Sequence, residues 1–213
     1  MDEIFFENLR EIVKRFKENV GGHELSHTER VYNLGSIFAK KEKADSDIVK
    51  AAAFLHDVAR MKEEKGEIKC HAEEGAKMAR EILEKTDFPK DKIAGVSECI
   101  RTHRYSKNLK AETKEAEIIQ DADRLDALGA VCIARIFSHG GKNGRPIHNP
   151  DIKPREFYDG SAATSSINHF YEKILKIKPE MFNTESARKI AKHRYKFVEN
   201  FIKEFLDEWE GKR

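Results

Sequence analysis

Histidine and aspartate side chains recur in this sequence at positions where helical spacing would bury them. The pair His56-Asp57 lies in the apolar run from Ile48 to Ala59. Burying an imidazole beside a carboxylate is costly unless a partner compensates both groups. A divalent cation would do so, because imidazole nitrogens and carboxylate oxygens are both metal ligands. The run therefore predicts a metal site, provided that further ligands converge on it.

Other segments of the chain supply candidates for those further ligands, namely His27, His71, His103 and Asp123. Each histidine is separated from apolar neighbours by helical intervals, as His27 is from Val31 and Phe38. Five helical segments thus each place a coordinating side chain on a face that should be buried. A core cannot hold several imidazoles and carboxylates without compensation. One shared cation would compensate all of them.

The ligand types restrict the metal. Imidazole and carboxylate together suit Mn, Fe, Co, Ni or Zn and are poorer for Ca. Structural zinc sites favour cysteine, whereas Cys70, Cys99 and Cys132 are widely spaced and form no CxxC pair. Adjacent helical residues point about 100° apart, so His56 and Asp57 share one metal only if it lies between them. With two metals, the Asp57 carboxylate could bridge.

The elements that must position these residues are helices. Apolar spacing is helical along nearly the whole chain, and no convincing run alternates with a period of two. We predict an all-α fold: a single-domain helical bundle covering residues 1–213, with a metal-binding core at about 20–140 and C-terminal helices at about 160–210 packed on it. The predicted helices cover about residues 2–19, 26–43, 46–60, 70–84, 90–104, 115–138, 163–177 and 184–210.

One segment, from Ser138 to Arg155, is too rich in Gly, Pro and Asn to be helix. We predict a long basic loop near 138–155. Loops of this length inside compact domains are usually functional or disordered. Its possible anion donors are Lys142, Arg145, His148, Lys153 and Arg155. Two interpretations stay open: a solvated surface loop, or a lid over an anionic substrate.

Composition excludes several classes of function. The 40 basic and 38 acidic residues nearly balance, which argues against a nucleic-acid binder. No apolar run approaches the roughly 18 residues that cross a bilayer, so no membrane partner is expected. The N-terminus lacks the basic start of a signal peptide, and the cysteines fit reduced thiols, so we expect a cytoplasmic protein.

The last predicted helix carries four aromatic side chains along one stripe, namely Phe197, Phe201, Phe205 and Trp209. Such a stripe packs either on the protein's own core or on a second subunit. Packing on the protein's own core is favoured. The alternative is packing on a second subunit in a homodimer.

The order His27, His56-Asp57 and Asp123 resembles the HD-domain phosphohydrolase superfamily, whose signature gathers His, His-Asp and Asp on a divalent metal. Asp123 lies in the matching segment Gln-Asp-Ala-Asp-Arg-Leu-Asp, which ends at Asp126. The segments Gly-Arg-Pro-Ile-His-Asn-Pro (144–150) and Ile-Asn-His-Phe-Tyr-Glu-Lys (167–173) resemble a small stand-alone bacterial and archaeal HD subfamily. Some members of that subfamily are Mn-dependent nucleotide pyrophosphohydrolases.

The resemblance implies roles for individual residues. The implied metal ligands are His27, His56, Asp57 and Asp123, with Asp121 competing for the last role. His71 and His103 match positions that bind a second metal in two-metal members, or that contact phosphate or shuttle protons in one-metal members. Mn is the implied metal, with Fe, Ni, Co, Mg and Zn as alternatives.

One position departs from the pattern. Several HD nucleotidases have a glutamate three residues after the His-Asp pair, whereas this chain has Arg60. The general base is then Asp126, His103 or a metal-bound hydroxide. The candidates for binding the substrate's phosphate are Arg60, Arg124, Lys142, Arg145 and Lys173.

These residues predict metal-dependent hydrolysis of a phosphorylated small molecule, most simply a nucleotide, by water activated on the metal. Two alternatives stay open. The same six histidines and aspartates follow the ligand order of HD-fold di-iron oxygenases. The domain could also be non-catalytic and use its metal site to sense or bind a nucleotide.

Overall fold

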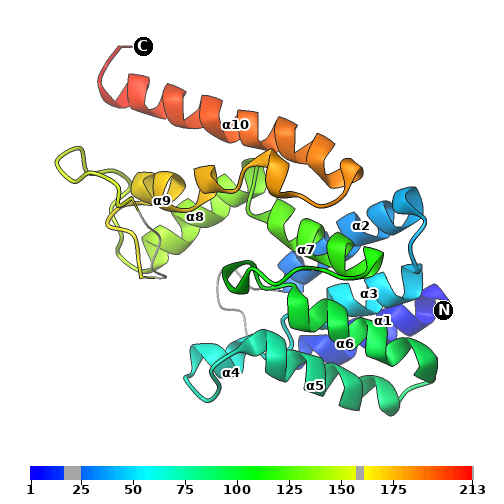
Figure 1. Cartoon of the computed structure of the whole chain (residues 1–213). Helices are drawn as coiled ribbons and strands as arrows, with labels where there is room; N and C mark the ends of the chain where they lie inside the picture. Colours follow the sequence, from blue (N-terminus) through cyan, green and yellow to red (C-terminus); the bar gives the residue numbers. More distant parts are fainter. Residues whose placement is uncertain (17–24, 157–160, 213) are drawn as a thin grey trace. The chain divides into compact units, whose positions relative to one another are not determined.

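Figure 1 shows the computed structural model, which describes residues 1–16, 25–156 and 161–212. Every regular element within these ranges is a helix, and none of these residues forms a strand. The all-α prediction is confirmed. No helix in the same ranges is both long enough and apolar enough to cross a bilayer.

The chain divides into two compact units, Met1–Arg124 and Leu125–Arg213, and the boundary falls inside one helix. This boundary cuts the metal-binding core that the sequence placed at about 20–140. Residues 20–24 of that core, and residues 17–19 of the first predicted helix, lie outside the described ranges. The single domain over the whole chain therefore stays a prediction.

The first unit is built around one short apolar helix. Its helices are α1 (Glu3–Lys14), α2 (Leu25–Glu42), α3 (Ser46–Leu55), α4 (Arg60–Glu64), α5 (His71–Glu84), α6 (Ile93–Thr102) and α7 (Lys114–Asp126), with 3-10 turns η1 (Lys90–Lys92) and η2 (Tyr105–Lys107). Helix α3 packs against α1, α2 and α6. Small side chains at Ala51, Ala52 and Ala53, all fully buried, let these helices approach closely.

The His-Asp pair does not lie within a helix, as the sequence suggested, but directly after one. Helix α3 begins where expected, because the Asp45 carboxylate accepts a hydrogen bond from the Asp47 backbone N–H at 2.9 Å. It ends at Leu55, and residues 56–59 form turns before α4. The Arg60 N–H donates to the Asp57 carbonyl at 3.0 Å, which is the short hydrogen bond of a tight turn.

The second unit contains the C-terminal helices. They are α8 (Ala130–Lys142), α9 (Ser166–Glu172) and α10 (Glu185–Trp209), with 3-10 turns η3 (Ile174–Lys176) and η4 (Pro179–Met181). Helix α8 packs against α9 and α10. Side-chain caps fix two starts: Ser165 accepts from the Asn168 N–H at 3.0 Å, and Thr184 accepts from the Ala187 N–H at 3.2 Å.

Two predicted boundaries around α8 are wrong. The helix predicted over 115–138 is two helices, α7 and α8, interrupted at Gly129, whose φ of 90° suits glycine. The predicted loop begins too early, because α8 continues through Gly140 and Gly141 to Lys142 and stops before Gly144, whose φ is 65°. Glycine weakens a helix but does not prevent one that packing supports.

The rest of the predicted loop is fastened to the start of α9. The backbone N–H groups of Ser166 and Ile167 donate to the carbonyls of Pro146 and Ile147 at 2.9 and 3.0 Å. The Asn168 amide donates to the Ile152 carbonyl at 3.0 Å. A segment held by these bonds is an ordered part of the second unit.

The aromatic stripe of α10 is not the face that this helix buries. The buried residues of α10 are Ala187, Ala191, Tyr195, Val198 and Ile202. Phe197 and Trp209, at the two ends of the stripe, are 46% and 51% exposed. The favoured expectation that the stripe packs in the core is therefore wrong at its ends. The homodimer stays a prediction.

Candidate metal centre

The first unit brings the six predicted ligands to one place. They come from helix ends: His27 from the first turn of α2, His71 from the first residue of α5, Asp123 from the last turns of α7, and His56, Asp57 and His103 from just after α3 and α6. Four histidines and Asp57 are each at most 4% exposed, and the Asp123 side chain is 26% exposed. This much buried polarity requires compensation.

The first donor group consists of His27, His56 and Asp123 together with one oxygen of Asp57. The Nε2 atoms of the two histidines are 3.2 Å apart. The Asp57 Oδ2 atom lies 3.9 Å from His27 Nε2 and 3.6 Å from His56 Nε2. The Asp123 Oδ1 atom lies 3.3 and 4.0 Å from the same two nitrogens. Four potential ligand atoms thus surround one point.

The second donor group consists of His71 and His103 together with the other oxygen of Asp57. The two Nε2 atoms are again 3.2 Å apart. The Asp57 Oδ1 atom lies 3.3 Å from His71 Nε2 and 3.7 Å from His103 Nε2. Asp57 therefore faces both groups, one through each carboxylate oxygen, as a bridging ligand between two ions would.

The histidine rings are held by their far nitrogens. His56 Nδ1 donates to the Ala53 carbonyl at 2.8 Å, and His103 Nδ1 donates to the Ile100 carbonyl at 2.6 Å. Because a carbonyl only accepts, these partners assign the proton to Nδ1 in each ring. In the neutral rings the Nε2 lone pairs then point toward the donor groups. This is the tautomer that binds a metal through Nε2.

His71 has a stronger anchor. Its Nδ1 lies 2.6 Å from Glu63 Oε2, which pairs it with a carboxylate instead of a carbonyl. With Nδ1 protonated in both His71 and His103, two Nε2 lone pairs face each other at 3.2 Å. That arrangement is repulsive unless a cation or proton lies between them. The donor set therefore fits a divalent metal.

The separations between donors also suit a metal. Ligand bonds of about 2.1 Å place neighbouring ligand atoms roughly 3.0–3.4 Å apart in octahedral or tetrahedral geometry. The closest pairs here are 3.2 and 3.3 Å apart. Two buried triads of this kind occur among the described residues: His27 with His56 and Asp57, and Asp57 with His71 and His103.

Burial and charge shift the proton affinities of these groups in different directions. Burial lowers the pKa of His56 to about 3 and also lowers that of His71. Burial opposes the protonation of His103 too, but its interactions with the carboxylates of Asp57 and Asp123 outweigh this and raise its pKa. Burial would raise the pKa of Asp123, yet its hydrogen bond with His27 and the neighbouring histidines lower it. Asp123 therefore stays an anionic ligand.

Two supporting residues were missed by sequence reasoning, Glu63 and Arg104. The Arg104 guanidinium forms an ion pair with Glu63, whose other oxygen holds His71. Burial would raise the pKa of Glu63, but the hydrogen bonds with His71 and Arg104 lower it. Glu63 lies in the charged run Met-Lys-Glu-Glu-Lys (61–65), where nothing distinguishes it from Glu64. Only the general need of metal-bound histidines for an outer carboxylate could have suggested it.

Among the other predicted residues of the first unit, Arg60 lies beside the second donor group. Its Nη1 atom is 3.3 Å from His71 Nδ1 and 3.5 Å from Glu63, and its Nε donates to Glu64 at 3.2 Å. Arg124 stacks on the ring of Tyr105, 5.4 Å from its centroid. Asp121 is fully buried and outside both triads.

The remaining predicted residues belong to the second unit. Asp126 is 2% exposed and forms an ion pair with Arg135. Lys142 is exposed at the end of α8, Lys173 is half-buried after α9, and Arg145 lines a pocket described below. The catalytic and substrate-binding roles of these residues stay predictions.

An all-α unit that gathers imidazoles and carboxylates around one bridging aspartate defines a candidate divalent-metal centre. The HD domain family matches residues 25–128, which include all six candidate ligands. The chain is 30% identical to Bacillus subtilis YpgQ over 191 residues, which is 86% of this chain and 82% of YpgQ. The chain belongs to the HD-domain family.

Solved structures of this family agree over nearly the whole chain. An HD-superfamily hydrolase from Bacillus thuringiensis has a TM-score of 0.76 and 33% identity, covering 98% of each chain. Bacillus subtilis YpgQ in complex with ADP has a TM-score of 0.72 and 28% identity, covering 95% of this chain and 96% of YpgQ. Similarity of this extent includes the C-terminal helices as well as the HD region.

Proposed function

We propose that this protein is a divalent-metal-dependent phosphohydrolase whose substrate is a nucleotide. The observation that carries the proposal is the position of Asp57, whose two oxygens each face a pair of histidine Nε2 atoms. Membership of the HD-domain family, with a neighbour that is an HD-superfamily hydrolase, supports the hydrolytic reaction. Mn is the proposed metal, because the resemblance to Mn-dependent HD-domain enzymes implies it and mixed imidazole and carboxylate ligands are compatible with it.

The protein's own residues would hold the metal and orient the reaction. A bound divalent cation supplies polarisation of a phosphoryl oxygen and a water of lowered pKa. Asp57 and Asp123 contribute negative charge, and the anchored rings of His56 and His103 keep their Nε2 atoms directed inward. The second donor group offers three ligand atoms against four in the first, which would leave more positions for water and a phosphate oxygen.

A nucleotide is proposed as substrate on two grounds. YpgQ, which is similar to this chain over most of its length, has been solved in complex with ADP. Arg60 places a guanidinium near the second donor group, on the outer side of the His71 ring, where its Nη1 atom is 3.3 Å from Nδ1 and 3.5 Å from Glu63. A guanidinium there is suited to a phosphate because it is planar and always charged.

The experiment is a hydrolysis assay on metal-reconstituted protein. Chelator-treated protein is loaded separately with Mn, Fe, Co, Ni, Mg or Zn and incubated with nucleoside mono-, di- and triphosphates, and released phosphate and pyrophosphate are measured. We expect turnover with Mn that disappears in Asp57→Ala. Turnover that survives Asp57→Ala would overturn the proposal, and substrate-dependent oxygen uptake with two irons would favour the oxygenase alternative.

The same assay tests the two predicted bases. If Asp126 acts on the attacking water, Asp126→Asn lowers kcat without changing metal content. If His103 does, His103→Gln lowers kcat together with metal content at the second donor group, because His103 is also a candidate ligand. If both variants keep full kcat, metal-bound hydroxide needs no further base.

A further inference from the structure

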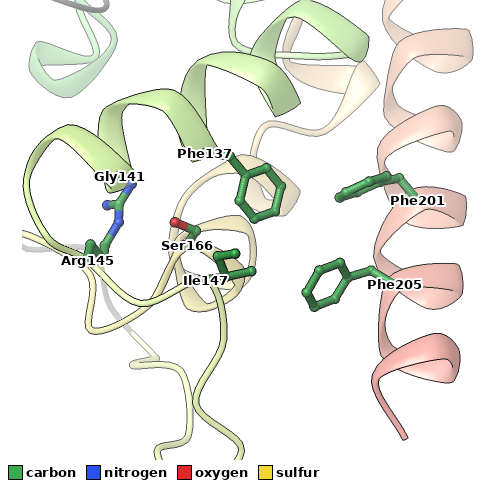
Figure 2. Close-up of a pocket in the computed structure, with 7 residues that line it drawn as sticks. All are labelled: Phe137, Gly141, Arg145, Ile147, Ser166, Phe201 and Phe205. Carbon is green, nitrogen blue, oxygen red and sulfur yellow. The ribbon is translucent and has the colours of Figure 1, made fainter. Parts of the chain in front are cut away.

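The second unit contains a pocket apart from the six candidate ligands. Its volume is about 370 Å³, and it lies between α8, the segment after it and α10 (Figure 2). The lining residues are Phe137, Gly141, Arg145, Ile147, Ser166, Phe201 and Phe205. Pockets that bind small molecules usually measure about 300–1,000 Å³ and combine apolar walls with a few polar groups.

One side of the pocket is aromatic. Figure 2 shows Phe201 and Phe205 of α10 facing Phe137 of α8 and Ile147. The Phe137 ring centroid is 6.0 Å from that of Phe201 and 6.1 Å from that of Phe205. Ile147 is 53% exposed, so this apolar surface is open to a ligand. An apolar chain or ring would bury it.

The other side of the pocket holds the charged side chain of Arg145. The Arg145 guanidinium donates from Nη2 to the Ile136 carbonyl at 3.1 Å, and its Nε atom is buried without a hydrogen-bond partner among the described residues. No salt bridge to Arg145 occurs in that part of the chain. The nearby Glu172 is engaged by Arg155, whose Nη2 lies 2.7 Å away. Arg145 is half-buried and its guanidinium stays charged, so an anion in the pocket would complement it.

The backbone of α8 is shaped to receive this arginine. A Cβ atom on Gly140 would lie 2.5 Å from Ser166 Oγ and 3.2 Å from Arg145 Nε. Glycine at this position therefore lets Arg145 and Ser166 lie against the helix. The next residue, Gly141, has nothing within 4 Å of its would-be Cβ. The close approach is thus specific to position 140.

We propose that this pocket binds a monocarboxylic acid with an apolar body, whose carboxylate pairs with Arg145 and whose apolar part lies against the three phenylalanines. A carboxylate suits a single guanidinium because the two groups match in shape and charge. The lining offers no carboxylate or amide side chain to read the edge of a nucleobase. The ligand is therefore distinct from the proposed nucleotide substrate, and the proposal does not depend on that function.

The probe is octanoate, compared with octan-1-ol as its uncharged counterpart. Trp209 is the single tryptophan, and its ring centroid is 5.7 Å from that of Phe205, so its fluorescence reports on the pocket. We expect saturable octanoate binding by fluorescence and calorimetry. In Arg145→Met, octanoate should bind about tenfold or more weakly, because a hydrogen-bonded charge is lost. Octan-1-ol should bind the two proteins equally.

A second pair of variants guards against one that merely misfolds. Gly140→Ala should weaken octanoate binding by displacing Arg145 and Ser166. Ser138→Ala, at an exposed position of the same helix outside the pocket lining, should leave it unchanged. Thermal melts and circular dichroism verify that each variant is folded. Three results would overturn the proposal: no saturable binding to the wild type, equal octanoate affinity in folded Arg145→Met, or displacement of octanoate by AMP. The last would assign the pocket to the nucleotide.

Discussion

The two donor groups of the metal centre share Asp57 but are supported differently. The first has a carboxylate of its own, Asp123, whose Oδ1 lies 3.3 Å from His27 Nε2. The second has no other carboxylate among its ligand atoms. Its extra negative charge comes from Glu63, which contacts His71 on the far side of the ring and is itself paired with Arg104.

This difference has consequences for metal binding. A carboxylate that ligates directly adds a full charge to a site, whereas one behind a histidine orients the ring and raises its basicity. We therefore expect the first donor group to bind its ion more tightly. The second, with three ligand atoms and a compensated outer carboxylate, should bind a weaker and more exchangeable ion with open positions for substrate and water.

Removing Asp57 should have the largest effect, because it belongs to both groups. In Asp57→Ala we expect both ions to be lost and hydrolysis to fall by at least about 100-fold, since even outer-shell changes cost 10–100-fold. Elemental analysis after desalting measures the ions per chain. Asp87→Ala, at an exposed position, is the control. Full metal content in folded Asp57→Ala would contradict the shared role.

Replacing Asp123 should affect metal binding at the first donor group and not at the second. In Asp123→Asn we expect the tighter ion to be lost while the second donor group, whose ligand atoms come from His71, His103 and Asp57, keeps its weaker ion. Asp121→Asn is the informative comparison, because Asp121 is fully buried two residues away and is the competing candidate for the same role. Metal titration with a competing chelator resolves the two affinities. Loss of metal in Asp121→Asn but not in Asp123→Asn would move the ligand to Asp121.

Weakening Glu63 should affect the second group alone. Glu63→Gln removes the charge behind His71, and we expect the weaker ion to bind about 10–100-fold less tightly. Glu64→Gln is a matched control, since Glu64 pairs with Arg60 but does not contact His71. Electron paramagnetic resonance of Mn-loaded protein would show the coupled pair of ions replaced by a single one. An unchanged pair in Glu63→Gln would show that His71 needs no outer carboxylate.

The sequence located the ligands better than it located their supports. His27, His71 and His103 were found because an imidazole on an apolar helical face is conspicuous, and the structure brings all three to Asp57. Glu63 was missed because its role depends on α4 folding back toward α5, a tertiary contact without a local pattern. Glu64 is the same residue type in the same charged run, but it pairs with Arg60 and does not contact His71.

The predicted helix boundaries were wrong at positions occupied by glycine. Gly129 interrupts a predicted helix, whereas Gly140 and Gly141 lie inside one that was predicted to have ended. Glycine costs about 1 kcal/mol in a helix, so packing against α9 and α10 can outweigh it. At Gly129 the φ of 90° is not a helical angle, so packing cannot continue the helix through this residue. The same residue type thus gave opposite outcomes, and only tertiary contacts separate them.

The smallest effect should appear in metal-free protein, where the two groups differ in proton affinity. An unfolded histidine has a pKa near 6.5. Burial lowers that of folded His56 to about 3. The unfolded chain thus binds this proton more tightly, and the stability linked to neutral His56 is present above pH 6.5 and lost as the pH falls toward 3. His103 has the opposite sign: because its pKa is raised in the folded protein, its contribution to stability is fully present below pH 6.5 and is lost as the pH rises from 6.5 through the raised pKa.

Nuclear magnetic resonance of the imidazoles in chelator-treated protein measures this difference directly. As the pH is lowered, His103 should become protonated first, while His56 stays neutral until the fold itself weakens. His56→Gln should flatten the loss of unfolding free energy between pH 6.5 and 3, because the group whose protonation opposes folding is gone. His103→Gln should not flatten it. If both histidines titrate together near pH 6.5, then burial does not lower the pKa of His56 and the interactions with Asp57 do not raise that of His103.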